Sequence, residues 1–162
     1  MITLKTLLNT LPQIGELCWI GLRPSRKTPM LCVPNVDVSP ENGLHGDRYS
    51  GQSGLRQVTL IQAEHMAAIG GVLGQDPVSP DLLRRNLVVR GINLLALKDR
   101  DVHLGSALIR VTGLCHPCSR MEATLGPGGY NAVRGHGGIT ARVLTAGQIK
   151  LGDQVRVVGS AK

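Results

Sequence analysis

The sequence contains no phenylalanine, and its only other large aromatic residues are Trp19, Tyr49 and Tyr130. Proteins that bind single-stranded nucleic acid stack the bases on aromatic side chains. The scarcity of such side chains therefore argues against nucleic acid as a partner, although the net charge is +7. The positive charges also occur singly or in the pairs Arg26–Lys27 and Arg84–Arg85, without a dense basic run.

Long apolar runs are missing as well. No stretch approaches the roughly 18 apolar residues that a membrane-spanning helix requires. Pro12 and Glu16 interrupt the start of the chain, where a signal peptide would need an unbroken apolar segment. We therefore expect a cytoplasmic protein that does not contact membranes and keeps its four cysteines reduced.

The length and composition fit one domain. A chain of 162 residues with 42% apolar side chains can bury a single substantial core. Thirteen arginines outnumber five lysines, and arginine binds phosphate and carboxylate groups through paired hydrogen bonds. This excess predicts an anionic small molecule as a partner, with a solvated basic surface as the alternative explanation.

Short segments rich in β-branched and apolar residues, separated by many of the 21 glycines, predict a mainly β protein. Residues 62–70 and the segment from Pro80 predict short helices, and residues 23–30 and 33–54 predict loops. The expected extended segments are 16–22, 31–33, 56–61, 86–91, 93–97, two strands around Gly105, and a final hairpin over 147–159 that turns at 151–153. Such a pattern favours a bent antiparallel β-barrel with a few short helices, spanning residues 16–160 after an N-terminal extension at residues 1–15.

The sequence Cys-His-Pro-Cys at residues 115–118 is the most informative motif. Such a pair can form half of a zinc site, a redox pair, or a reactive thiolate with a neighbouring thiol. The remaining cysteines, Cys18 and Cys32, lie far upstream and lack zinc-site spacing. A thioredoxin-type pair needs a βαβ context, which the pattern does not show. A reactive Cys118 and two buried structural cysteines remain as alternatives.

Within the pair, Cys118 is expected to be the more reactive thiol and Cys115 the auxiliary one. Ser119 and Arg120 follow Cys118 and can stabilise a thiolate, whereas Cys115 follows an apolar strand. Pro117 disfavours a helical conformation at the residue before it, so the two sulfurs should lie in different environments.

Glycines and basic residues recur near this motif. Six glycines lie between Gly126 and Gly138, interleaved with Arg134 and His136. Backbone amides in such a segment can converge on an oxyanion, and a mobile surface loop is the alternative. Two further segments, GLHGDR (43–48) and LLRRNLVVRG (82–91), contribute Arg48, Arg85, Asn86 and Arg90 near the ends of expected elements.

The chain resembles the MOSC domain family, named for the C-terminal part of molybdenum cofactor sulfurases. The resemblance extends from about Glu16 to Val158 through the segments GLHGDR, RQVTLIQAEH, LLRRNLVVRGINLLAL, TGLCHPCSRME and GDQVRVV. It implies a pyruvate-kinase-like β-barrel with a recurrent cysteine, which aligns with Cys118. Pyridoxal phosphate, which the sulfurases bind through another domain, is not expected in this chain.

The resemblance implies two possible functions, and the basic composition leaves a third. In the first, Cys118 is the catalytic cysteine and the molybdenum ligand in a pterin-cofactor reductase of N-hydroxylated compounds, served by an electron-donor protein. In the second, Cys118 carries persulfide sulfur received from a cysteine desulfurase. In the third, the protein is a non-enzymatic anion-binding module. The residues expected to bind the cofactor are Arg48, Arg85, Asn86, Arg90, Arg120, Arg134 and His136.

Overall fold

The computed structural model describes residues 1–49 and 53–159, and within them seven strands close into a β-barrel. Around the barrel the order is β11-β7-β8-β9-β5-β6-β1, and pairing between β1 and β11 completes the circle. The strands are β1 (Gly15–Leu22), β5 (Val58–Gln62), β6 (Leu87–Arg90), β7 (Asp101–Leu104), β8 (Ala107–Leu114), β9 (Ile139–Thr145) and β11 (Gln154–Val157). The predicted barrel is therefore confirmed.

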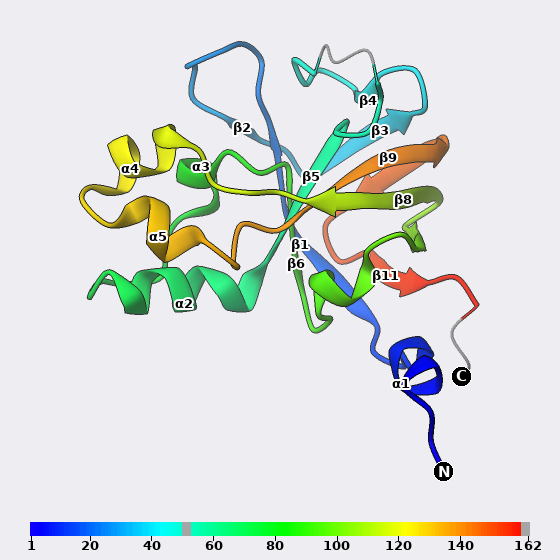
Figure 1. Cartoon of the computed structure of the whole chain (residues 1–162). Coiled ribbons are helices and arrows are strands. Elements are labelled where there is room, and N and C mark those ends of the chain that lie inside the picture. The colour runs from blue at the N-terminus through cyan, green and yellow to red at the C-terminus, as the bar shows by residue number, and fades with distance from the viewer. Residues whose placement is uncertain (50–52, 160–162) are drawn as a thin grey trace.

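One neighbouring pair of barrel strands, β5 and β6, runs parallel, and the other pairs of the barrel run antiparallel. A parallel pair needs a crossover connection, which here contains α2 (Ala63–Val72) and α3 (Pro80–Leu83). Both helices were expected. Figure 1 shows them on one side of the barrel, together with α4 (Ser119–Leu125) and α5 (Gly129–Val133) from the connection between β8 and β9.

A smaller sheet corrects two expectations. It contains β10 (Gly147–Lys150), β3 (Asn35–Ser39) and β4 (Gly43–Leu44), so the segment expected to be a loop contains two short strands. Residues 50–52 of that loop, and residue 160 at the expected domain end, lie outside the described residues. The predicted hairpin is also wrong, because β10 pairs with β3 whereas β11 pairs with β7 and β1.

The reason for the missing hairpin is burial. Ile149 of β10 and Val36 and Val38 of β3 are buried in the same core as β11. Pairing with β3 therefore keeps the apolar side of β10 against that core. The partner strand lies more than 100 residues earlier in the sequence, so local pattern does not predict this pairing. The expected short strand near residue 31 is confirmed as β2 (Leu31–Cys32), which pairs with the end of β1.

The barrel has an inner and an outer apolar core. On β6, Leu87 and Val89 are buried in the barrel interior, whereas Val88 packs in a second cluster with residues of the helices. This alternation follows from the two-residue period of a strand. The second cluster includes Ile69 of α2, Leu83 of α3 and residues of α4 and α5. The helices are thus held against the outer face of β5 and β6.

Residues 94–97 form a 3₁₀ helix, η1 (Leu94–Leu97), where an extended segment was expected. The Asn93 side chain accepts a hydrogen bond from the Leu95 amide at 3.2 Å and caps the first turn. Leu94 and Leu97 are both buried, and residues three apart share a face in this helix type. The apolar run therefore reflects a helical turn with one buried face.

The N-terminal helix α1 (Leu4–Asn9) contains no buried residue. Arg100 of the barrel donates hydrogen bonds to the Leu8 carbonyl at 2.7 Å and to Asn9 Oδ1 at 2.8 Å. Throughout residues 1–49 and 53–159, helices of the length and apolarity needed to cross a membrane are absent.

Candidate functional site

Strand β8 leads the chain directly into the cysteine motif. Cys115, just after this strand, is buried, and its amide donates to the Gly138 carbonyl at 2.9 Å. The chain then passes His116 and Pro117, and Cys118 caps the start of α4 with an extended backbone. The Cys118 thiol is exposed. The two thiols therefore lie in different environments, with Cys115 buried and Cys118 exposed. The sequence predicts that Cys115 is the more desolvated of the two.

An open cleft of about 340 Å³ lies at Cys118. Its lining comes from the loop after β1, from the segment after β4, from β5, from the end of α3 and from the cysteine motif. The lining residues are Arg23, Arg48, Tyr49, Arg56, Thr59, Arg85, Cys115, His116 and Cys118. Four arginines thus line the same cleft as two cysteines, and guanidinium groups are chemically suited to contact anionic groups.

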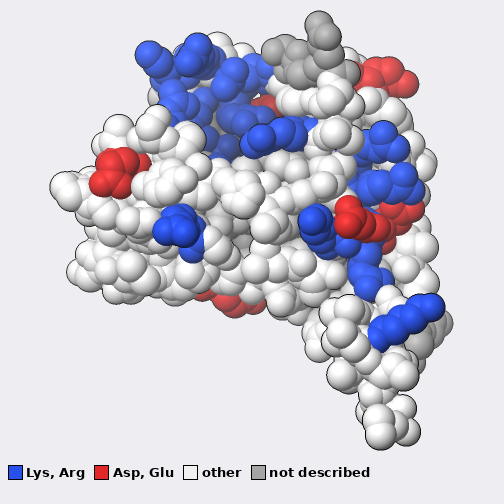
Figure 2. Space-filling model, in the orientation of Figure 1, with Lys and Arg blue, Asp and Glu red and all other residues white. Residues whose placement is uncertain are grey.

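The molecular surface shows the same concentration of charge. In Figure 2, Lys and Arg side chains gather at one corner, over the region where Figure 1 shows the connection from β1 to β2. The other basic side chains on this face lie apart from this group, several of them beside acidic ones. This corner is therefore the most basic part of this face, and the connection from β1 to β2 begins with Arg23, which lines the cleft.

Arg85 is the buried cation of the cleft, with 8% of its surface exposed. Its Nε donates to the Gly137 carbonyl at 2.8 Å and one terminal nitrogen donates to the Leu83 carbonyl at 2.7 Å. The other terminal nitrogen, Nη2, is buried without a hydrogen-bond partner among the described residues. A buried donor without a partner is costly, so Nη2 retains an unused capacity to donate a hydrogen bond.

Behind the cleft, Asn86 organises a buried polar network. Asn86 is fully buried, and its Oδ1 accepts hydrogen bonds from the Thr59 amide and hydroxyl, both at 3.1 Å. Its Nδ2 donates to the Gly21 carbonyl at 3.1 Å and to Asp47 Oδ1 at 3.2 Å. Asn86 therefore positions the walls of the cleft, and its own side chain has partners from the protein.

Asp47 in turn fixes Arg23. The Asp47 side chain is fully buried and forms an ion pair with Arg23 at 2.8 Å. It also accepts hydrogen bonds from the Arg23 amide at 2.7 Å and from Arg23 Nε at 3.1 Å. A bidentate pair of this kind fixes the orientation of a guanidinium group. One carboxylate thus holds Arg23, while Arg48, Arg56 and Arg85 form no ion pair within the described residues.

Two adjacent glycines allow the backbone to pack tightly beside the cysteine motif. A Cβ at Gly137 would lie 2.2 Å from the Cys115 carbonyl oxygen, and one at Gly138 would lie 1.9 Å from the Leu60 carbonyl oxygen. Gly138 also has a φ of +90°, which side chains disfavour. These glycines let the Gly137 carbonyl reach Arg85.

The glycine-rich segment does not offer its amides to the cleft in the way a phosphate-binding loop would. The carboxylate of Glu122 accepts hydrogen bonds from the Gly128 amide at 2.7 Å and from the Tyr130 amide at 2.9 Å. These bonds, first that of Tyr130 and then that of Gly128, lower the pKa of Glu122. The convergent amides expected in this segment exist, and the chain's own carboxylate occupies them.

The structure brings some of the predicted ligand residues together. Cys118, Arg48 and Arg85 line the same cleft, and Asn86 lies directly behind it. Arg120 lies in a second cavity, described below. The sequence thus identifies the thiol and two of the cleft's guanidinium groups.

Besides Asn86 and Arg120, three further predicted ligand residues lie outside the lining of the Cys118 cleft. Arg90 forms an exposed ion pair with Glu16 at 2.7 Å. Arg134 is exposed and donates to Asn131 Oδ1 at 3.2 Å. The ring of His136 packs edge-on against that of His65 of α2, with centroids 4.9 Å apart. Burial, followed by the charge of His136, lowers the pKa of His65.

Sequence reasoning missed Arg23, Arg56, Tyr49 and Thr59. Arg23 follows the expected strand 16–22 and Arg56 opens the expected strand 56–61, where neither was considered as a ligand, and the folded barrel brings them to the cysteine. The sequence did contain one signal for Arg23. Asp47 directly precedes Arg48, and a carboxylate at this place could pair with an arginine from another segment.

The arrangement of side chains does not support structural zinc. Within the described residues, no group of three or more His, Cys, Asp and Glu side chains is placed to hold a metal ion. One exposed thiol surrounded by cations can instead contribute a single ligand to a metal that brings other ligands with it.

The chain matches the family model of the MOSC domain over residues 45–156. Among solved structures, it is similar to the YuaD protein from Bacillus subtilis, with 18% identity, a TM-score of 0.77, and coverage of 89% of this chain and 95% of that one. It is also similar to YiiM from Geobacillus stearothermophilus, with 19% identity, a TM-score of 0.70, and coverage of 91% and 79%. YiiM from Escherichia coli gives 17% identity, a TM-score of 0.70, and coverage of 91% and 71%. Curated protein sequences give no match.

Proposed function

We propose, from the premise that this chain belongs to the MOSC domain family, that its Cys118 cleft binds a molybdenum–pterin cofactor and reduces N-hydroxylated compounds. The observation that carries the proposal is the partnerless, buried Arg85 Nη2 in a cleft that also contains an exposed thiol. A cofactor with a phosphate group needs cations, and its metal needs a ligand from the protein. The residues present fit both needs.

Each residue of the cleft has a defined part in this proposal. The Cys118 thiolate would ligate the metal, since a thiolate rather than a thiol is the ligand form of cysteine. Arg85 would donate Nη2 to an anionic group of the cofactor, and Arg48 and Arg56 would neutralise its remaining charge. Asn86 and Asp47 hold the walls in place through hydrogen bonds to Thr59 and Arg23. When bound, the cofactor supplies the oxygen-atom transfer chemistry.

The same geometry supports a second candidate, a persulfide carrier. The Cys118 thiol is exposed at an open cleft, as a sulfur carrier requires if a cysteine desulfurase is to load it. The surrounding guanidinium groups would stabilise the negative charge of a persulfide. The two candidates differ in what remains bound after purification: molybdenum and a pterin in the first case, sulfane sulfur in the second.

The experiment is an elemental and sulfur analysis of protein purified from a host that makes the cofactor. We expect molybdenum by mass spectrometry and a pterin by fluorescence, together with reduction of an amidoxime by a chemical electron donor. Cys118→Ser should lose the molybdenum, and Cys115→Ser should retain most of it because Cys115 is a buried wall of the cleft. Folded wild-type protein with sulfane sulfur but no molybdenum would favour the carrier, and protein with neither would overturn both candidates.

A further inference from the structure

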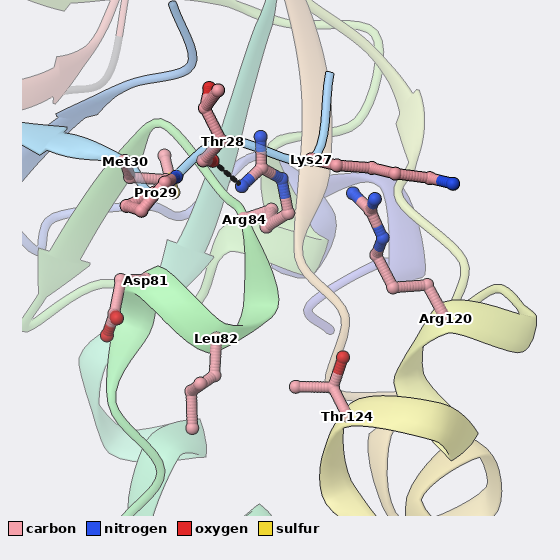
Figure 3. Close-up of a pocket in the computed structure, with 9 residues that line it drawn as sticks. All are labelled: Lys27, Thr28, Pro29, Met30, Asp81, Leu82, Arg84, Arg120 and Thr124. Carbon is pink, nitrogen blue, oxygen red and sulfur yellow. Dashed lines mark hydrogen bonds between the residues drawn. The ribbon is translucent and has the colours of Figure 1, made fainter. Parts of the chain in front are cut away.

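A second cavity lies next to the Cys118 cleft, between the loop after β1 and the helices α3 and α4. Its volume is about 380 Å³, within the range of roughly 300–1,000 Å³ that is typical of small-molecule sites. Figure 3 shows its lining: Lys27, Thr28, Pro29, Met30, Asp81, Leu82, Arg84, Arg120 and Thr124. Arg120 lies two residues after Cys118 in the sequence, so the two cavities share one short segment.

Three cations from three separate segments converge on this cavity. Lys27 comes from the loop after β1, Arg84 from the end of α3, and Arg120 from the first turn of α4. In Figure 3 the guanidinium of Arg120 reaches toward that of Arg84 and toward the ammonium of Lys27. Such convergence requires the folded protein, because the three residues are far apart in the sequence.

The backbone at two of these residues is unusual. Lys27 has a φ of 65° and Arg84 a φ of 55°, and they are two of the three non-glycine residues with positive φ among those described. A non-glycine side chain is strained in this region, and such residues cluster at functional sites. Hydrogen bonds keep Arg84 in place, since it donates to the Thr28 carbonyl at 2.5 Å and to the Ser25 carbonyl at 3.4 Å.

Among the described residues, the carboxylates form no ion pair with the three cations of the cluster. The described residues form three ion pairs, and none of them includes Lys27, Arg84 or Arg120. Asp81 accepts a hydrogen bond from Ser79, and its carboxylate points away from the three cations in Figure 3. Burial lowers the pKa of Arg84, and the like charges of Arg120, Arg23 and Arg48 lower it further. A bound anion would relieve this repulsion.

We propose that Lys27, Arg84 and Arg120 bind the phosphate group of a phosphorylated small-molecule substrate whose reacting part extends into the Cys118 cleft. Two guanidinium forks and an ammonium suit the three oxygens of a phosphate monoester. Pro29, Met30 and Leu82 form an apolar wall for the organic part of the ester. The proposal rests on the proposed function in one respect, which is that the Cys118 cleft is the reaction site.

The test is calorimetric titration of the purified full chain with adenosine 5′-monophosphate (AMP), adenosine and inorganic phosphate. AMP is the probe because its ring can contact the apolar wall while its phosphate contacts the cations. We expect AMP to bind more tightly than adenosine or inorganic phosphate. Lys27→Met and Arg120→Gln should each weaken AMP binding by about tenfold, since each removes a charge-assisted contact.

Matched controls are Lys150→Met and Arg156→Gln, which remove the same charges from β10 and β11 outside the cavity. Both should bind AMP like the wild type. Equal weakening by the controls, or AMP binding no tighter than that of inorganic phosphate, would overturn the proposal. Loss of molybdenum and pterin in Lys27→Met and Arg120→Gln would also overturn it, because the cavity would then belong to the cofactor. AMP binding to metal-free protein through these cations would support the proposal even if the reductase function failed.

Discussion

Among single residues, Arg85 links the structural core to the candidate site. Its Nε and one terminal nitrogen donate to the Gly137 and Leu83 carbonyls, which fixes the guanidinium, and the other terminal nitrogen, Nη2, is buried without a partner among the described residues. Lysine could not make both fixed contacts and leave a directed donor, because its ammonium lacks the planar fork of arginine. Arginine is therefore the side chain that this position requires.

The two cysteines of the motif should differ in their reactivity. Cys118 is exposed and Cys115 is 5% exposed, so Cys115 reacts only when the structure opens locally. We expect iodoacetamide to modify Cys118 at least about tenfold faster than Cys115. Peptide mass mapping over time measures both rates, with the exposed Cys32 as an internal reference.

In denaturant the difference between Cys115 and Cys118 should disappear, since burial is its cause. Equal rates in the native protein, or faster modification of Cys115, would show that the wrong cysteine has been assigned as the reactive one.

Among the elements, α4 and α5 depend on one carboxylate. Glu122 of α4 accepts the amides of Gly128 and Tyr130 at the start of α5, and these bonds join the two helices beside the cysteine motif. Satisfying the first amides of a helix stabilises its N-terminus. The glycine-rich turn is therefore fixed by the chain itself.

Glu122→Gln should weaken this connection in a pH-dependent way. The bonds lower the pKa of Glu122 in the folded state. Its contribution to stability is thus present above the unfolded pKa of about 4.3 and is lost as the pH falls through the lower folded pKa. We expect Glu122→Gln to lower the urea midpoint at pH 7, and the difference from the wild type to shrink toward pH 3.

Glu41→Gln, a change at an exposed carboxylate between β3 and β4, is the control and should follow the wild type at every pH. A Glu122→Gln effect that stayed constant from neutral to acidic pH would contradict the assignment of the effect to the ionised carboxylate.

For the whole molecule, stability depends on closure of the barrel around its interior core. Strand β1 pairs with both β6 and β11, so it joins the two ends of the sheet. Its residues Leu17 and Ile20 are fully buried inside. The N-terminal helix, in contrast, leaves Leu4, Leu7 and Leu8 more than half exposed.

Leu17→Ala should lower the free energy of unfolding by about 2–5 kcal/mol, the range for large-to-small changes in a core. Leu4→Ala, at a side chain that is 71% exposed, should change it by no more than about 0.5 kcal/mol. Urea unfolding followed by circular dichroism compares the two variants. Similar losses in both variants would contradict the assignment of stability to the closed barrel core.

The sequence by itself determined the barrel, most of its strands, and the helices after Ile61 and at Pro80, and it identified Cys118 as the candidate reactive thiol. These features depend on local information: strand alternation, turn residues, helix formers and a compact motif. The sequence also placed Arg48 and Arg85 among the candidate ligands. Arg90, Arg134 and His136, selected because they lie near these motifs, point elsewhere in the structure.

Tertiary structure alone decided the rest, because contacts between distant segments were needed. Burial of Ile149 against β3 separated β10 from β11, and buried leucines three residues apart turned residues 94–97 into a helix. The same barrel closure brought Arg23 and Arg56 to Cys118, and Lys27 to Arg84 and Arg120. The periodicity of a single segment does not predict which residues of distant segments become neighbours, since these contacts form only when the strands close into a barrel.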